Sequence, residues 1–497
     1  MMHARIYSIE RALQAATTVF LFCYVIVQPA SIAVTHIFYA AAAVTWLARL
    51  VIVRQNGLYS GPLDLPILIY LVLCAISAAY SPLPESSWEG MRKVALVCVV
   101  LVFAQNVHTL ARAKQLVNVL FAAALVTVVW SLWLYLGGVG LRVGNVNTQS
   151  PWYGAGLRTD DTILRVDGKT LTTSRQLLAY LRTKPGGDTL QLGIVPPDGI
   201  EVSRNIKPMA VSPAVWRPAE TSGQIGVDLA KARPVRAFGF YSHYVTYSMV
   251  LALLASLMFG LWLGQREHFS AQGWLCAIVF AAVTLVLGMT LTRAAWAALL
   301  FACAVQLWFH FRQKFVRLVL PVAAVLSLLV ASAAMYHWRG VSFFDLNDPG
   351  TDYRFLMWKD GLRLIRQHPL VGIGMNSVRD DWWLFDLAAY RKYPLRSHFH
   401  STPIQIAVES GIPALLSWIV FMAVYCRMLL QLIARSRDEQ DRWTYGFALG
   451  ALGATAGLLA SSIVHYDFGD SVVIFLFWFM TGIALALRHM LEPAAIP

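Results

Sequence analysis

"HYVTYSMVLALLASLMFGLWLG", residues 243–264, is an apolar stretch without a single Asp, Glu, Lys or Arg. An α-helix rises about 1.5 Å per residue, so roughly 20 such residues cross the ~30 Å hydrocarbon core of a bilayer. The stretch therefore predicts a membrane-spanning helix. It decides the fold class because runs of the same kind recur along most of the chain.

The composition agrees with this interpretation. Of 497 residues, 58% are hydrophobic and only 13% are charged, whereas about a quarter of a soluble domain is charged. No small-residue cleavage site follows the first apolar run, so we interpret it as a retained helix and not as a signal peptide. We expect an all-α polytopic membrane protein with about 12 transmembrane helices, near residues 11–31, 33–53, 63–81, 92–107, 114–136, 243–264, 271–289, 294–311, 315–335, 403–433, 443–464 and 470–488.

The loops between these spans fall into two sets that differ in charge. One set is basic, and the opposite short loops, such as 81–90 and 465–470, are neutral or acidic. The positive-inside rule then places both termini in the cytoplasm. The net charge of +13 is largely this topology signal, and its dispersal over many loops disfavours nucleic-acid binding. Two long loops, 137–242 and 336–402, remain on the non-cytoplasmic side, where we expect the functional residues.

Cysteines and acidic residues do not suggest a metal or disulfide site. All six cysteines lie inside apolar runs, where cysteine behaves as a small hydrophobic residue. No group of Asp, Glu and His has convincing spacing for a divalent ion. We therefore expect no metal and no cofactor.

The first long loop changes composition abruptly. Alternating segments near 162–168, 189–195 and 201–206 predict strands, Ser174–Arg182 predicts a short helix, and Gly-containing turns separate them. The stretch "SPWYGAGLRTDDTILRVDGKTL", 150–171, resembles a PDZ domain, with Asp160 where glycine is usual. The resemblance covers about 139–230 and predicts a small α+β domain inserted between helices.

The last strand of this domain resembles the peptide-binding strand of bacterial PDZ domains. It is "GQIGVDLA", 223–230, and backbone N–H groups at Ile225, Gly226 and Val227 would accept an extended peptide from a protein partner by β-augmentation. The alternative is a closed module that serves only as a spacer.

The second long loop is rich in basic residues. A basic cluster outside the cytoplasm calls for a ligand, and phosphate suits arginine because the guanidinium binds it in a bidentate manner. The alternative is pairing with the aspartates of the same loop. Arg293 and Arg236 lie at the ends of apolar runs, where an arginine either snorkels or faces a polar cavity.

A PDZ-like domain beside membrane helices also suggests an intramembrane protease. The chain contains neither H-E-x-x-H nor G-x-S-x-G. Asp360 and Asp470 lack the G-x-G-D context that resembles intramembrane aspartyl proteases. A protease is therefore disfavoured.

Four stretches, in order, resemble the O-antigen ligase/polymerase superfamily of integral-membrane glycosyltransferases. They are "RAFGFYSHYVTY" (236–247), "TLVLGMTLTRAAWAALL" (284–300), "YRFLMWKDGLRLIRQHPLVGIGMNSV" (353–378) and "HSTPIQIAVESGIPALL" (400–416). Thr292 stands where serine is common, and Ser401 where asparagine is usual. The resemblance covers about 10–490, and the PDZ insertion departs from the family pattern.

The resemblance implies a GT-C-like enzyme of the bacterial inner membrane. Such enzymes transfer a glycan from undecaprenyl pyrophosphate to an acceptor hydroxyl on the periplasmic face, without a metal. The reaction needs a base near the hydroxyl and positive charge over the leaving pyrophosphate.

Carried onto this chain, the resemblance makes His400 the base or acceptor-orienting residue, with Arg354 and Arg293 as the pyrophosphate clamps. Further substrate-binding candidates are Arg236, Tyr353, Arg396, His398 and Glu409. Glu409 either orients the site or satisfies a helix neighbour.

The expected domains are helices at 1–138, the PDZ-like domain at 139–230, helices at 231–335, a periplasmic catalytic loop at 336–402 and helices at 403–497. The leading hypothesis is ligation of O-antigen to lipid A–core. Alternatives within the superfamily are polymerisation of lipid-linked repeats and glycosylation of protein hydroxyls. From another class, a lipid-linked glycan flippase would need charges in several spans, and the first five predicted spans contain almost none.

Overall fold

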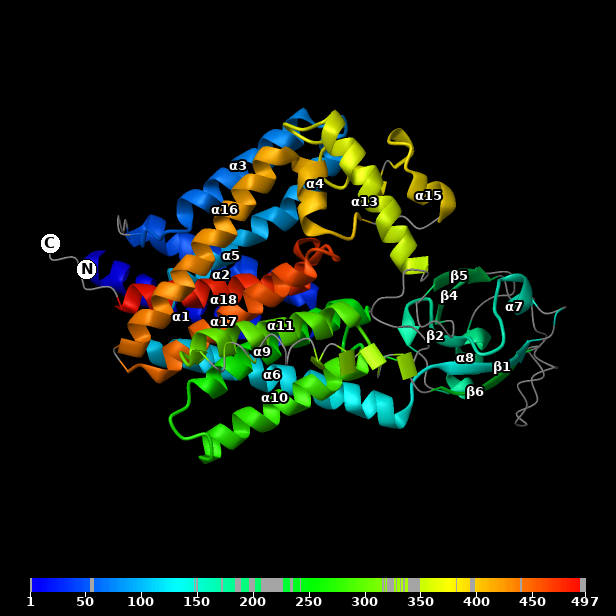
Figure 1. Cartoon of the computed structure of the whole chain (residues 1–497), viewed down its shortest axis with the longest axis horizontal. Coiled ribbons are helices and arrows are strands. Elements are labelled where there is room, and N and C mark those ends of the chain that lie inside the picture. Colours follow the sequence, from blue (N-terminus) through cyan, green and yellow to red (C-terminus); the bar gives the residue numbers. More distant parts are fainter. Residues whose placement is uncertain are drawn as a thin grey trace. The chain divides into compact units, whose positions relative to one another are not determined.

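The computed structural model describes most of the chain. The described residues are 2–53, 58–146, 148, 151–170, 173–183, 189–195, 202–206, 227–232, 236–241, 243–314, 317, 319, 326–327, 329–330, 332–333, 336–337, 349–380, 382–393, 398–438 and 440–491. They form two compact units, Met1–Thr127 with Phe240–Pro497, and Val128–Gly239 (Figure 1).

The first unit is helical. Its longer elements are α1 (Met2–Val27), α2 (Ile32–Val53), α3 (Asp64–Tyr80), α4 (Pro84–Val94), α5 (Val99–Ala104), α9 (Tyr244–Leu263), α10 (Ala271–Met289), α11 (Arg293–His310), α13 (Pro349–Gln367), α16 (Thr402–Asp438), α17 (Arg442–Ser461) and α18 (Ser471–Leu491). Helix α6 (Leu110–Gly137) continues from the first unit into the second. The chain is thus the expected polytopic α-helical protein.

The number of spans is not confirmed at twelve. Within the described residues, eight helices are long and apolar enough to cross a bilayer, namely α1, α2, α6, α9, α10, α16, α17 and α18. Helix α3 is apolar but shorter, and the span expected at 92–107 is divided by a 3-10 turn, Ala95–Cys98, between α4 and α5. The span expected at 315–335 lies largely outside the described residues.

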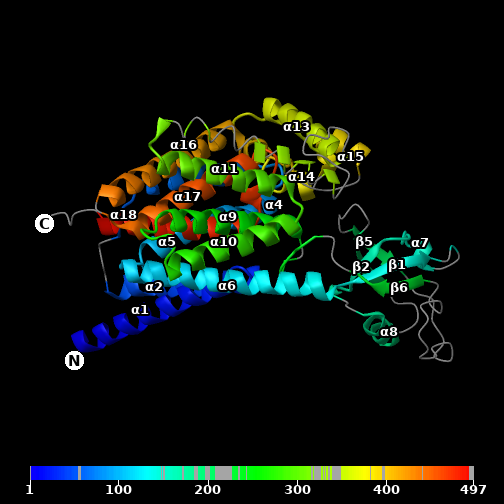
Figure 2. The same cartoon turned by 60° about the horizontal axis from the view of Figure 1, so that its bottom comes forward.

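Helices α9, α17 and α18 form the buried centre of the first unit (Figure 2). A Cβ on Gly260 of α9 would overlap the backbone of Gly450 of α17, so the two helices touch through glycine. Small residues permit this approach, which favours helix association in a bilayer. The resulting core supports the helix ends that carry the site.

Helix α16 is bent within "ESGIP" (409–413). Gly411 has φ 82° and ψ 169°, and Pro413 has no N–H to give the Glu409 carbonyl four residues before it. That carbonyl accepts hydrogen bonds from Ser77 Oγ (2.7 Å) and Gly374 N (2.9 Å) instead. The Ser77 hydroxyl and the N–H of Gly374, at the end of the "HPLVGIG" loop (368–374), therefore replace the helical N–H that Pro413 lacks.

Replacing Gly411 with alanine should destabilise the protein by about 1–3 kcal/mol from backbone strain, and more from steric overlap. An added Cβ would overlap the Leu370 carbonyl and lie 2.9 Å from Val371 N. Gly288 of α10 is the control, because a Cβ there meets nothing within 4 Å. Thermal unfolding in detergent should show a lower melting temperature for Gly411→Ala only, and equal melting temperatures would contradict this account of the bend.

The second unit contains a small antiparallel sheet in the order β5-β4-β2-β1-β6, with β3 (Lys169–Thr170) on β2. The strands are β1 (Leu141–Val146), β2 (Thr162–Val166), β4 (Leu190–Val195), β5 (Val202–Ile206) and β6 (Val227–Lys231), and the helix is α8 (Ser174–Arg182). Side chains from the sheet and α8, including Leu141, Ile163, Leu177 and Leu192, make a separate core. The expected strands and helix are confirmed.

Asp160 and strand β6 are the two features of this domain that bear on its resemblance to PDZ domains. Asp160 has φ 70°, so it adopts the left-handed conformation for which PDZ sequences usually carry glycine, and Arg142 Nη2 donates to its carboxylate at 2.8 Å. Strand β6 is an edge of the described sheet, paired with β1. Val227 begins this strand, whereas Ile225 and Gly226 lie outside the described residues.

Candidate active site

His400 lies in the short segment that leads into α16. Its φ of 49° is left-handed, a conformation uncommon outside glycine, and such backbone outliers concentrate at functional sites. The ring centroid of His400 lies 4.3 Å from that of His398 and 5.6 Å from that of Tyr353. The Arg354 guanidinium is close enough to act on it electrostatically. Four predicted site residues therefore meet here.

The loop between α17 and α18 brings a further histidine into the group. Thr402, the first residue of α16, donates its backbone N–H to the carbonyls of Ser462 (2.8 Å) and His465 (3.0 Å). His465 lies within electrostatic range of Arg293, Arg354, His398 and His243. These contacts define what we call the cationic cluster, which consists of His243, Arg293, Arg354, His398, His400 and His465.

Three histidines of the cationic cluster, His398, His400 and His465, are held neutral. Burial, followed by the charges of His398, Arg354 and His465, lowers the pKa of His400 well below its ordinary value. Burial lowers the pKa of His398 to about 4 and, with Arg354 as the next cause, that of His465 to about 3. At pH 7 the arginines carry the positive charge and the imidazoles remain able to accept a proton.

A pair of residues on α16 holds this arrangement together. Gln405 Oε1 accepts from the backbone N–H of Phe399, between the two histidines, at 2.8 Å. One turn later, Glu409 Oε1 accepts from Asn376 N at 2.8 Å, and its carboxyl also hydrogen bonds with Gln405 and Tyr466. Gln405 and Glu409 thus form a clamp that joins the His398–His400 segment, the 368–376 loop and the α17–α18 loop.

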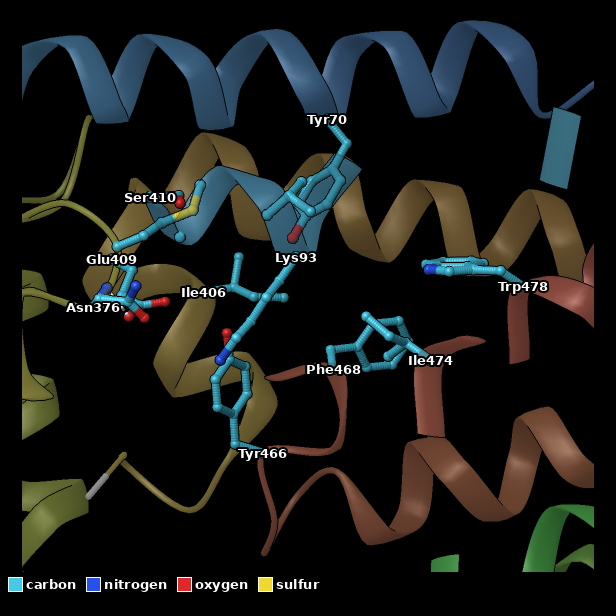
Figure 3. Close-up of a pocket in the computed structure, with 13 residues that line it drawn as sticks. Tyr70, Lys93, Asn376, Ile406, Glu409, Ser410, Tyr466, Phe468, Ile474 and Trp478 are labelled. Carbon is cyan, nitrogen blue, oxygen red and sulfur yellow. Dashed lines mark hydrogen bonds between the residues drawn. The ribbon is translucent and has the colours of Figure 1, made fainter. Parts of the chain in front are cut away.

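Beside the clamp lies a small hollow. Figure 3 shows Lys93 of α4 reaching down towards Tyr466, with Glu409 and Asn376 on one side. The ammonium of Lys93 lies in electrostatic range of both His398 and Glu409. The other side is apolar, lined by Ile406, Phe468, Ile474 and Trp478.

The other predicted site residues are not seen to join the cationic cluster. Arg236 is buried in the second unit. Arg396 lies outside the described residues. Most of the remaining basic residues of the long loop pair with its aspartates, as the alternative reading held. The pairs are Arg363–Asp360 (3.4 Å), Arg379–Asp380 (3.1 Å), Lys392–Asp352 (2.9 Å) and Arg391–Asp386.

Several site residues did not stand out in the sequence. His465 and Tyr466 belong to "HYDFGD" (465–470), whose sequence indicates only a neutral or acidic loop. Gln405 carries a signal, since four residues separate it from Glu409 and place both on one helix face. Among the described residues, no group of three or more His, Cys, Asp or Glu side chains is arranged to hold a metal ion.

Replacing Glu409 with alanine should destabilise the protein by about 1–3 kcal/mol, because Asn376 N would lose its buried acceptor. Glutamine keeps a side-chain oxygen at the same reach, so Glu409→Gln should retain most of the stability. Melting temperatures of the two variants provide the measurement. A loss for glutamine as large as for alanine would mean that the carboxylate charge, and not the clamp, is what matters.

Comparisons with known families match two regions of the chain. The family model described as O-antigen ligase matches residues 276–419, which include Arg293, Arg354, His400 and Glu409. A PDZ domain model matches residues 111–197, from α6 through β4. No curated protein matches the chain. The ligase match supports a role in glycan transfer for O-antigen or lipopolysaccharide assembly, and the chain is a multi-pass membrane protein that contains an O-antigen ligase domain and a PDZ domain.

Proposed function

We propose that the chain transfers a glycan from undecaprenyl pyrophosphate to a hydroxyl of lipid A–core, at the periplasmic face of the bacterial inner membrane. The observation that carries the proposal is the cationic cluster, in which arginine charge adjoins imidazoles held neutral by burial. Transfer from a diphosphate needs both: positive charge for the leaving group and a base for the acceptor hydroxyl.

In the proposed reaction, His400 accepts the proton of the acceptor hydroxyl as its oxygen bonds to the anomeric carbon of the donor sugar. The bond between that carbon and the pyrophosphate oxygen breaks, and the leaving pyrophosphate retains the electron pair. Arg354 and Arg293 stabilise the charge that develops there, and no metal is required. The neutral state of His400 supports its assignment as the base.

Tyr353 and His398 are proposed to bind substrate beside His400, since both rings adjoin it. Arg236 and Arg396 remain proposed substrate-binding residues on the family pattern alone. Glu409 is better explained as a positioning residue, because its carboxyl is engaged with Asn376, Gln405 and Tyr466. The proposed topology has cytoplasmic termini, with the PDZ domain and the 336–402 loop in the periplasm.

A flippase is less well supported. Arg293 begins α11, His400 precedes α16 and His465 follows α17, so these charged and polar groups gather at helix ends. Translocation across the membrane calls for polar groups along the spans. A transfer reaction at one face of the membrane therefore explains the positions of these residues better than translocation does.

The choice of acceptor can be tested with the purified full chain and an undecaprenyl-pyrophosphate glycan. The donor is supplied with lipid A–core, with a polypeptide that carries serine and threonine, or alone. We expect glycosylated lipid A–core. Elongated lipid-linked glycan without added acceptor would indicate the polymerase alternative, and modified polypeptide would indicate protein glycosylation, to which the PDZ domain would contribute.

A further inference from the structure

Helix α4 contributes one basic residue to the hollow beside the clamp. Lys93 lies in the last turn of α4, just before the 3-10 turn Ala95–Cys98. Its side chain lines the hollow together with Asn376, Glu409 and Tyr466, and Figure 3 shows it directed into this space. In the proposed topology this end of α4 is periplasmic. An ionisable residue at the end of a span calls for a partner or a ligand.

Helix α4 is fixed against the segment 373–380, which carries part of the clamp. Ser86 Oγ donates to Asp380 Oδ2 at 2.6 Å. A Cβ on Gly90 would overlap a side chain of the same segment, so the helix backbone touches it. Ser86, Gly90 and Lys93 follow one another at spacings of four and three residues, which places them on one helix face. The packing of α4 therefore directs Lys93 towards the site.

The ammonium of Lys93 has its hydrogen-bond donors available. Among the described residues, none forms an ion pair or a hydrogen bond with it. The carboxyl that lines the same hollow, that of Glu409, is engaged by Asn376, Gln405 and Tyr466. Lysine has three N–H donors, and here all three remain open to water or to a ligand.

The hollow adjoins the cationic cluster. Lys93 is within electrostatic range of His398, whose ring lies 4.3 Å from that of His400. The donor diphosphate is proposed to lie beside these rings, and its several anionic oxygens can accept from more than one cation. The hollow is small, so it can admit an oxygen atom or a bridging water but not a sugar ring. An anionic oxygen of the diphosphate is therefore the ligand group that fits.

We propose that Lys93 binds an anionic oxygen of the diphosphate of the lipid-linked donor, as a third cation beside Arg293 and Arg354. The inference rests on the proposed function, because it concerns the donor of that reaction. It extends the site to the N-terminal helices, whereas the O-antigen ligase match begins at residue 276 and assigns no role to α4. A compact ammonium acts on phosphate as a point charge and complements the bidentate contacts of the arginines.

The test measures the binding of undecaprenyl pyrophosphate, without a glycan, to the purified full chain in detergent. Lys93→Met removes the ammonium but keeps a long side chain, and its affinity should fall by about tenfold or more. Arg92→Met is the matched control, because Arg92 is the preceding residue of α4, is exposed and does not line the hollow. Its affinity should stay within about twofold of the unaltered protein. Lys93→Arg restores a cation and should recover most of the affinity.

The outcomes separate this inference from the proposed function. Equal affinities of Lys93→Met and Arg92→Met would overturn the role of Lys93. A loss seen only with a donor that carries acidic sugars, while the bare diphosphate lipid binds normally, would overturn the diphosphate as its ligand. If Lys93→Met does not fold, Lys93→Gln takes its place and is held to the same comparison. Failure of the unaltered chain to bind the diphosphate lipid would overturn the proposed function, and this inference with it.

Discussion

His400→Ala should reduce glycan transfer by about a hundredfold or more, the usual contribution of a general base. The segment before α16 holds His400 against His398 and Tyr353. Alanine removes the proton acceptor but leaves Phe399 N bound to Gln405. Donor binding and the melting temperature should therefore change little. The measurement is the initial rate of transfer in a reconstituted assay with lipid-linked donor.

His36→Ala is the matched control, because His36 is an exposed histidine of α2 that bonds to the Ile32 carbonyl. Its rate should stay within about twofold of the unaltered protein. Full transfer by His400→Ala, with the fold intact, would show that another group takes the proton. His465→Ala then becomes the next variant, since His465 lies in the same cluster.

The pH profile provides an independent check on the same residue. The pKa of His400 is lowered, so its neutral form persists as the pH falls through the ordinary histidine value of about 6.5. The rate should therefore begin to fall only below that pH, and His400→Ala should lose this acid limb. A limb centred above the ordinary value would mean that His400 is not held neutral during the reaction.

The helices and the inserted domain were largely predictable because their signals are local. The apolar stretch at 243–264 became α9, Tyr244–Leu263, and the amphipathic segment Ser174–Arg182 became α8 with the same bounds. Hydrophobic runs and period-two alternation depend on neighbouring residues. The break at Ala95–Cys98 was not predicted, because its sequence, "ALVC", is as apolar as a continuous helix.

The site was only partly predictable because it is assembled from distant segments. His400 and Glu409 share one stretch, and their spacing to each other is visible in the sequence. His465 reaches the same place only because Thr402 bonds to the end of α17. The clamp of Gln405 and Glu409 likewise joins loops that begin at residues 368 and 462. Such contacts follow from tertiary packing, which local patterns do not encode.

The arrangement also explains why only some of the arginines matter for the proposed chemistry. Aspartates neutralise Arg363, Arg379 and Arg391, and these pairs stabilise the loop and do not supply charge to a ligand. Arg293 and Arg354 instead lie within range of the neutral histidines. Substitution of arginine by lysine keeps the positive charge but removes the planar guanidinium. Such variants can therefore distinguish the arginines paired with aspartate from those near the histidines.

Arg354→Lys should lower the transfer rate by about tenfold or more, whereas Arg391→Lys should change it by less than about twofold. Lysine keeps the positive charge but loses the planar fork that contacts two phosphate oxygens at once. Arg354 lies next to Tyr353 in α13 and acts on both His400 and His465, so a poorly held leaving group there should slow the chemical step.

Arg391 is the matched control because it belongs to the same loop but is exposed and paired with Asp386, an ion pair that lysine can preserve. Both variants should keep the melting temperature of the unaltered protein, so the comparison isolates transfer. The loss for Arg354→Lys should appear in the maximal rate at saturating donor, because bidentate contacts strengthen as charge develops on the pyrophosphate. Equal rates for the two variants would remove Arg354 from the pyrophosphate site and leave Arg293 as its principal cation.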